Sequence, residues 1–116
     1  MAVVEMPGKG RGVIARRPIA ADTLLEVAPV LPYSRADRPK RSSVLAHYPF
    51  QWDSPPHIEC IALGLTSLLN HSNEPNCWVE SDVEGGVMRL RSKVDIAAGE
   101  ELTHNYGVDP WFDVVA

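Results

Sequence analysis

Two short polar stretches, far apart in the chain, hold the residues best suited to chemistry. Asn70, His71 and Ser72 directly follow a strongly apolar run, and Tyr106 lies near the end of the stretch Glu-Glu-Leu-Thr-His-Asn-Tyr-Gly. The first stretch comes where a helix should stop and leave its last carbonyl groups without partners, so a polar ligand could be held there. The tyrosine supplies a hydroxyl that can orient an amine and a ring that can wall a channel. Together the two stretches suggest a methyl-transfer site.

The elements that must bring these stretches together are mostly short β-strands. The exception is a predicted helix from His57 to Leu69, where the apolar residues fall on one helical face. Residues 29–56 carry six of the ten prolines, so we expect extended or irregular structure there, with a short helix near Ser42 to His47. Strands are expected at Met1–Met6 and Val13–Ala15, joined by a glycine-rich turn into a hairpin, and at Thr23–Val27, Trp78–Val79, Val87–Val94 and Glu101–Tyr106.

Length and composition favour one globular domain. The chain has 116 residues, of which 45% are hydrophobic, so we expect a single modest core and one domain over residues 1–116. We expect neither a membrane span nor a secretory leader. Cys60 and Cys77 could form one disulfide, but two such residues are more often buried thiols in a reducing compartment. The expected location is therefore intracellular: the cytoplasm for a bacterial protein, or a host nucleus for a viral protein or an effector.

The net charge of −4 hides an asymmetry along the chain. Residues 1–41 hold eight Lys/Arg and four Asp/Glu, whereas residues 42–116 hold three and eleven, so the two parts carry +4 and −8. An acidic C-terminal part argues against nucleic acid as the main ligand, because phosphate binding needs clustered basic side chains. It suits a basic peptide, although the same charges could serve only to keep a small domain in solution.

The motifs and their order resemble the SET domain of protein lysine methyltransferases. A lone Gly-x-Gly is a weak signal because glycine-rich turns are common, and a lone Tyr-Gly is an ordinary strand end. The combination of Asn-His-Ser with Pro-Asn-Cys is much more specific, and the resemblance covers essentially the whole chain. The matching segments are Gly10-Arg11-Gly12-Val13 for the family's Gly-x-Gly cofactor loop, Asn70-His71-Ser72 with Pro75-Asn76-Cys77 for its Asn-His-Ser signature, and Gly99-Glu100-Glu101-Leu102 leading to Tyr106-Gly107 for its C-terminal signature.

The resemblance implies a fold, a cofactor and a reaction. The fold is mostly β (α+β), with several small β-sheets around one main helix and the C-terminal segment folded back in a pseudoknot-like arrangement. The chain looks like a minimal stand-alone SET domain of bacterial or viral type, without zinc-binding flanks. Its cofactor would be S-adenosyl-L-methionine and its substrate a lysine in a basic, histone-like protein segment. By this resemblance Tyr106 is the catalytic residue, and the cofactor is held by Lys9, Gly10, Arg11, Gly12, Asn70 and His71.

Further aromatic residues are candidates for the walls of the site. Trp111 could cover the cofactor and Phe112 one side of the lysine channel, although two aromatics near a C-terminus could equally dock it to the core. Tyr33, Trp78 and His104 are the other candidates for the channel. His104 stands where the family often has a Tyr or Phe that limits methylation, so mono-, di- or trimethylation stays open.

Three kinds of function follow from these residues. An active lysine methyltransferase is the main prediction, and a catalytically inactive SET-like module that binds a peptide or the cofactor is the alternative. The third is a hydrolase, either metal-dependent with His57, Cys60, His71 and Cys77 as ligands, or a thiol hydrolase in which His71 or His104 activates Cys77. His57-x-x-Cys60 is only half of a zinc site and no third catalytic group is visible, so neither is favoured and no metal is expected. So small a domain could also form a homodimer. Direct binding to nucleic acid or to a membrane is not expected.

Overall fold

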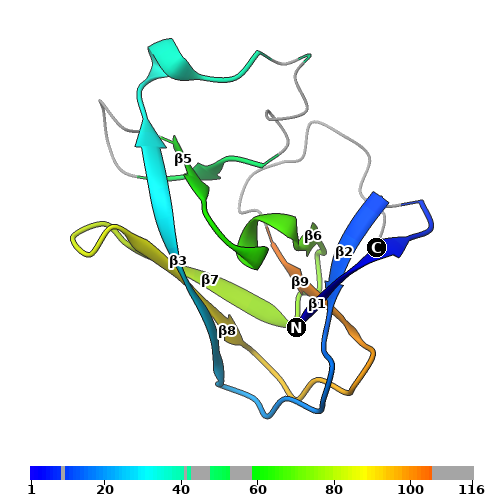
Figure 1. Cartoon of the computed structure of the whole chain (residues 1–116). Coiled ribbons are helices and arrows are strands. Elements are labelled where there is room, and N and C mark those ends of the chain that lie inside the picture. The colour runs from blue at the N-terminus through cyan, green and yellow to red at the C-terminus, as the bar shows by residue number, and fades with distance from the viewer. Residues whose placement is uncertain (9, 41, 43–47, 53–58, 106–116) are drawn as a thin grey trace.

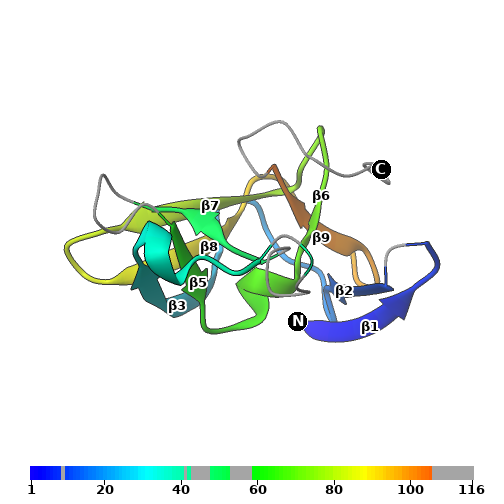
Figure 2. The same cartoon turned by 90° about the horizontal axis from the view of Figure 1, so that it is seen from above.

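The computed structural model describes residues 1–8, 10–40, 42, 48–52 and 59–105 of the chain. Strands dominate these residues and form a four-stranded and a five-stranded sheet. The two sheets lie beside one another, as the two perpendicular views show (Figures 1 and 2). The predicted mostly-β class is therefore confirmed.

The four-stranded sheet joins the beginning of the chain to its last described strand. β1 (Ala2–Met6) and β2 (Gly10–Ile14) form the predicted antiparallel hairpin. β9 (Glu101–His104) lies antiparallel to β2, and β6 (Asn70–His71) lies parallel to β9 on its other side. Parallel strands cannot be joined by a tight turn, and here the connection from β6 to β9 is long enough to contribute two strands to the other sheet. The last described strand is thus inserted between the hairpin and the Asn-His segment (Figure 1).

The five-stranded sheet is organised around β3 (Leu24–Tyr33). β8 (Val87–Ser92) pairs with the first half of β3, and β5 (Glu59–Ala62) pairs with its second half. β7 (Cys77–Asp82) and β4 (Phe50–Gln51) form the two edges. The turn between β7 and β8 contains Gly85 and Gly86, and Gly86 has a φ of 69°.

Buried side chains from both sheets make up two hydrophobic clusters. Residue burial alternates along β8, as the two-residue period of a strand requires, so that Met88 and Leu90 face inward. Val79, from the edge strand β7, packs against both clusters. The first cluster contains Val13, Ala15, Leu69, Cys77, Leu90, Ile96 and Leu102, and the second contains Ala28, Cys60, Ala62 and Met88.

The predicted helix from His57 to Leu69 is wrong over its described part. Residues 59–62 form strand β5, and only the short 3-10 helix η3 (Leu65–Leu68) follows. Cys60 and Ala62 are both buried, with Ile61 between them only partly so, which is the period of a strand. η3 itself is anchored from outside, because the Glu26 carboxylate accepts hydrogen bonds from the backbone N–H groups of Leu65 and Thr66. The spacing of the apolar residues fits the period of a helix as well as that of a strand. The pairing of residues 59–62 with β3 makes this segment a strand.

β3 also runs further than predicted, through Pro29 and Pro32 to Tyr33. Pro29 lies where the ladder with β8 ends and the ladder with β5 begins, a position where a missing N–H is tolerated. The 3-10 helix η1 (Arg35–Asp37) then ends this segment. The short helix predicted near Ser42 to His47 lies almost wholly outside the described residues. Within the described part of the chain, no helix is long and apolar enough to span a membrane.

Candidate active site

The three motifs of the sequence meet in the four-stranded sheet. In the pairing of β2 with β9, Val13 lies opposite Leu102 and Ile14 opposite Glu101. In the pairing of β6 with β9, Asn70 lies opposite Thr103 and His71 opposite His104. The fold therefore places the Gly-x-Gly strand and the Asn-His strand on the two sides of the strand that leads to Tyr106 (Figure 1).

The Asn70 side chain joins all three strands. Its Nδ2 donates to the backbone carbonyl of Arg11 on β2, at 3.1 Å, and to Oε2 of Glu101 on β9, at 2.7 Å. Both partners can only accept, so the amide nitrogen must face them and the amide oxygen must point away. Among the described residues no partner is recorded for Oδ1. Asn70 thus offers one fixed acceptor next to the Gly-x-Gly strand.

The two glycines of the Gly-x-Gly segment differ in what surrounds them. A Cβ on Gly12 would lie 2.9 Å from Glu101 Oε2 and 3.0 Å from Asn70 Nδ2, and it would also collide with Met6 Sδ. Gly10 has a φ of 77°, which favours glycine, and a Cβ there would meet no atom within 4 Å. Gly12 therefore allows the Asn70–Glu101 pair to lie against the strand, whereas the backbone at Gly10 borders open space.

His71 and His104 form a buried pair at the end of this sheet. His71 Nε2 hydrogen-bonds Asn73 Oδ1 at 3.1 Å, and the His104 ring packs against Phe50 with the ring centroids 5.4 Å apart. Burial lowers the pKa of His104 from 6.5 to about 4, a hydrogen bond with the Asn105 backbone opposes this, and nearby His71 lowers it further. His104 is therefore a neutral imidazole at neutral pH.

Asn76 fastens the loop after β6 to strand β9, a role that the sequence analysis did not assign. Its Oδ1 accepts from the Thr103 N–H at 2.8 Å, and its Nδ2 donates to the Glu101 carbonyl at 2.7 Å and to Glu100 Oε2 at 3.3 Å. The Asn76 backbone carbonyl in turn accepts from the Lys93 N–H at 2.7 Å. Asn76 belongs to the Pro-Asn-Cys part of the motif, and its side chain holds this loop against β9. Glu101 lies within the C-terminal signature, but the sequence gives no signal that its carboxylate contacts Asn70.

Tyr33 and Trp78 belong to the five-stranded sheet. The Tyr33 hydroxyl donates to Glu59 Oε1 at 3.1 Å, and burial together with this carboxylate raises the pKa of the phenol well above its ordinary value. Trp78 is half exposed on edge strand β7, with Lys93 Nζ 5.3 Å from its ring centroid. These contacts are with Glu59 and Lys93, so the role of Tyr33 and Trp78 in a substrate channel stays a prediction.

Four of the predicted site residues lie outside the described residues: Lys9, Tyr106, Trp111 and Phe112. Tyr106 directly follows Asn105, the residue that ends the described part of the chain. Since β9 ends at His104, the catalytic role predicted for Tyr106 rests on the sequence motif alone and stays a prediction.

Neither cysteine is set up as a nucleophile. Cys60 and Cys77 are buried free thiols, as expected, and burial raises the pKa of each to about 11. A thiolate is the reactive form, so a raised pKa opposes the thiol hydrolase alternative. Among residues 1–8, 10–40, 42, 48–52 and 59–105 there is also no group of three His, Cys, Asp or Glu side chains that could hold a metal ion.

Comparison with known families agrees with this arrangement. The family model described as the SET domain matches residues 10–107. The chain belongs to the SET-domain family. The match begins at the first glycine of the Gly-x-Gly segment and ends at the glycine after Tyr106, so the three motifs all fall within the SET domain.

Named relatives of this SET domain are histone-lysine N-methyltransferases. The Schizosaccharomyces pombe enzyme specific for H3 lysine-37 is 35% identical over 107 residues, and the match covers 90% of this chain and 71% of that protein. The S. pombe enzyme specific for H3 lysine-36 is 33% identical over 110 residues, covering 87% of this chain and 14% of that protein. This SET domain thus spans most of the first relative but only a small part of the second.

Solved structures share the fold. A proposed histone methyltransferase of Plasmodium falciparum superimposes with a TM-score of 0.75 at 23% identity, covering 96% of both chains. KRYPTONITE, in a complex with mCHG DNA and SAH, superimposes with a TM-score of 0.68 at 26% identity, covering 92% of this chain and 23% of that one. The arrangement of the two sheets is therefore that of a SET domain.

Proposed function

We propose that this chain is an S-adenosylmethionine-dependent protein-lysine N-methyltransferase that acts on a basic, histone-like segment. The observation that carries the proposal is the Asn70 amide, which ties the Gly-x-Gly strand and the Asn-His strand to the strand that leads to Tyr106. Chance placement of three such motifs would not bring them into one hydrogen-bonded sheet.

The donors and acceptors around Asn70 fit the methionine part of the cofactor. Bound S-adenosylmethionine supplies a methyl group on a positively charged sulfur. Asn70 Oδ1 is oriented away from Arg11 and Glu101 and can accept a hydrogen bond from the amino group of that cofactor. The backbone at Gly10 has open space beside it and can approach the ligand closely. SAH in the KRYPTONITE complex supports this choice of cofactor.

The site must also keep the substrate amine unprotonated. A free lysine has a pKa near ~10.4, so about one in a thousand is nucleophilic at neutral pH, and a dry channel next to a cationic sulfur lowers that pKa. His104 is neutral at neutral pH and packs against Phe50, so this residue brings no charge that would hold the proton on the amine. Tyr106 would orient the amine lone pair in line with the methyl group.

A histone tail is the substrate best supported by the relatives and by charge. The named relatives are specific for lysines of histone H3. Residues 42–116 of this chain carry a charge of −8, from three Lys/Arg and eleven Asp/Glu, which suits a lysine-rich segment.

A transfer assay with a matched tyrosine control tests the proposal. The full chain is incubated with methyl-labelled S-adenosylmethionine and mixed core histones, alongside Tyr106→Phe and Tyr48→Phe. We expect labelled histone with the wild type and Tyr48→Phe and at least a hundredfold less with Tyr106→Phe, the scale of losing one group that acts in the transition state. Cofactor binding by calorimetry without transfer to any histone would instead indicate a non-catalytic module, and absence of binding would reject both functions.

A further inference from the structure

The outer face of the five-stranded sheet carries a concentration of exposed apolar side chains. Strand register places these residues on one side, because Val27 pairs with Arg89, Leu24 with Arg91 and Leu31 with Ile61, and cross-strand partners share a face. The opposite face holds the buried cluster of Ala28, Cys60, Ala62 and Met88. Among the described residues, five of the eight exposed large hydrophobic residues belong to the outer face: Leu24 (44% exposed), Val27 (48%), Leu31 (58%), Leu63 (57%) and Trp78 (50%).

Leu63 joins the strip because it continues the alternation of β5 just beyond its end. Its N–H donates to the Pro29 carbonyl at 2.7 Å, which places it beside β3 between Val27 and Leu31. The four aliphatic residues Leu24, Val27, Leu31 and Leu63 therefore form a continuous strip along β3, here called the β3 strip. The largest apolar patch on a monomeric protein is typically on the order of a few hundred Å², and such a patch is often a binding surface.

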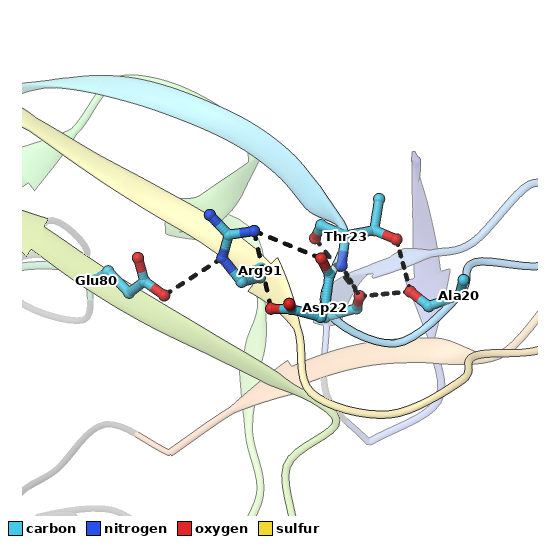
Figure 3. A network of polar contacts seen from close by, with 6 residues as sticks. Ala20, Asp22, Thr23, Glu80 and Arg91 are labelled. Carbon is cyan, nitrogen blue, oxygen red and sulfur yellow. Dashed lines mark hydrogen bonds and ion pairs between the residues drawn. The ribbon is translucent and has the colours of Figure 1, made fainter.

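Charged residues flank the β3 strip, but they neutralise one another. Arg89 Nη1 lies 3.0 Å from Asp82 Oδ2, and Arg91 Nε lies 3.4 Å from Glu80 Oε1. Figure 3 shows the Arg91 guanidinium between Glu80 and Asp22, with Nη1 3.8 Å from Asp22 Oδ1. On the other flank Arg38 Nε pairs with Glu59 Oε1 at 3.1 Å. Lys93, whose Nζ lies 5.3 Å from the Trp78 ring centroid, supplies the fourth positive charge. These flanking groups therefore balance at four positive and four negative charges, with no excess to attract a basic tail, an acidic peptide or nucleic acid.

These observations favour a second copy of this chain as the partner. A two-fold contact requires a patch that complements the same patch on a second copy. An apolar strip with balanced charges on its flanks meets that condition, because two such strips can pack together without like-charge repulsion. We infer that the β3 strip is the interface of a homodimer in which the outer faces of two five-stranded sheets pack together. This inference does not rest on the proposed enzymatic activity.

The size of the face predicts a weak dimer. Ten residues at roughly 3.3 Å each and three strands at about 4.8 Å spacing give on the order of 500 Å² for each copy. A pair would then bury on the order of 1,000 Å² in total, at the lower limit for a specific interface. We therefore expect a dissociation constant in the micromolar range, and a fraction of dimer that depends on concentration.

Sedimentation equilibrium of the full chain tests the interface directly. The wild type should rise from the monomer mass of 12.8 kDa toward twice that value as concentration increases. Leu31→Lys and, separately, Leu63→Lys should stay monomeric over the same range, because either lysine would be buried against the partner copy. Val94→Lys, a similarly exposed residue outside the strip, should behave as the wild type.

Circular dichroism melts show which variants fold, and Leu63→Lys lies outside any strand, so it provides a second test if Leu31→Lys is unstable. A wild type that remains monomeric at all concentrations would overturn the inference and leave another kind of partner for the strip. Dimerisation that survives in folded Leu31→Lys or Leu63→Lys would also overturn it, because the contact would then involve a different surface.

Discussion

His71 and His104 lie side by side as register partners of the parallel strands β6 and β9, and both are buried. Two sequence motifs separated by more than thirty positions are therefore paired in one sheet at these two histidines. Because His104 has its pKa lowered to about 4, mainly by burial, it enters this contact without charge. The contact between the Asn-His segment and the C-terminal signature is thus favoured at neutral pH and opposed by protonation.

The pKa of His104 predicts a loss of stability in acid. The folded-state pKa of about 4 lies below the ordinary 6.5, so the unfolded chain binds more protons between these values. The contribution of His104 to the free energy of unfolding is fully present above pH 6.5 and is lost as the pH falls toward 4. One extra proton in the unfolded state costs about 1.4 kcal/mol for each pH unit.

Urea unfolding at pH 7 and at pH 5.5 measures this loss in the wild type and in His104→Phe, which keeps a ring against Phe50. We expect a smaller change for the variant. Equal pH dependence in the two proteins would show that His104 does not titrate as its burial implies.

Asn70 is expected to set the affinity for the cofactor. Asn70→Ala should weaken the binding of S-adenosylmethionine about tenfold or more, the scale of one lost hydrogen bond of roughly 1.4 kcal/mol. Asn70→Asp should be worse, because it would place a carboxylate where Nδ2 now lies 2.7 Å from Glu101 Oε2. The double variant Asn70→Asp with Glu101→Gln restores a donor–acceptor pair and should recover part of the affinity. Calorimetry that finds the same affinity in all four proteins would remove Asn70 from the cofactor site.

Gly12 should not tolerate even a methyl group. The added Cβ of Gly12→Ala would lie 2.9 Å from Glu101 Oε2 and 3.0 Å from Asn70 Nδ2, so the hydrogen-bonded pair would have to move. Overpacking of this kind costs about 1–3 kcal/mol of stability. Adding Met6→Ala removes the flexible sulfur from the collision but leaves the Asn70–Glu101 pair in place, so it should rescue little. Denaturation of the single and double variants decides this, and full rescue by Met6→Ala would mean that the Asn70–Glu101 pair is not constrained.

Asn76 should matter for stability rather than for contact with the substrate. Asn76→Ala removes the acceptor for the Thr103 N–H and the donor to the Glu101 carbonyl, and we expect a loss of about 2–3 kcal/mol. Glu74→Ala changes an exposed side chain in the same loop and should stay within about 0.5 kcal/mol of the wild type. Equal unfolding free energies for Asn76→Ala and the wild type would show that the loop does not fasten β9.

Strands were easier to predict from this sequence than the segment between residues 57 and 69, where the expected helix is wrong over its described part. The N-terminal hairpin and the β7–β8 hairpin were predictable because each combines apolar alternation with a glycine turn in a short stretch of chain. The helix over residues 57–69 was not, because Ile61 and Leu65 satisfy both a helical and a strand pattern. Only the pairing of Cys60 with Pro32, across a long separation in sequence, decides between them.

The candidate site, like the fold, was predictable from the sequence only in part. Asn70 and His71 could be named as candidates because their types and order form a specific motif. Asn76 and Glu101 also lie within the motifs, but their contacts with β9 and with Asn70 became visible only when the fold brought β9 beside β6. Residues that act by orienting others have no signature of their own in a single sequence.

Tandem mass spectrometry of histones tests the central claim most directly, because it reports both the transfer and the acceptor. Mixed core histones would be incubated with the full chain and with S-adenosylmethionine that carries a deuterated methyl group. We expect deuterated methyl groups on lysine side chains with the wild type, and none above background with Tyr106→Phe. The central claim would be contradicted by a wild type that leaves every histone unlabelled, or by label on residues other than lysine.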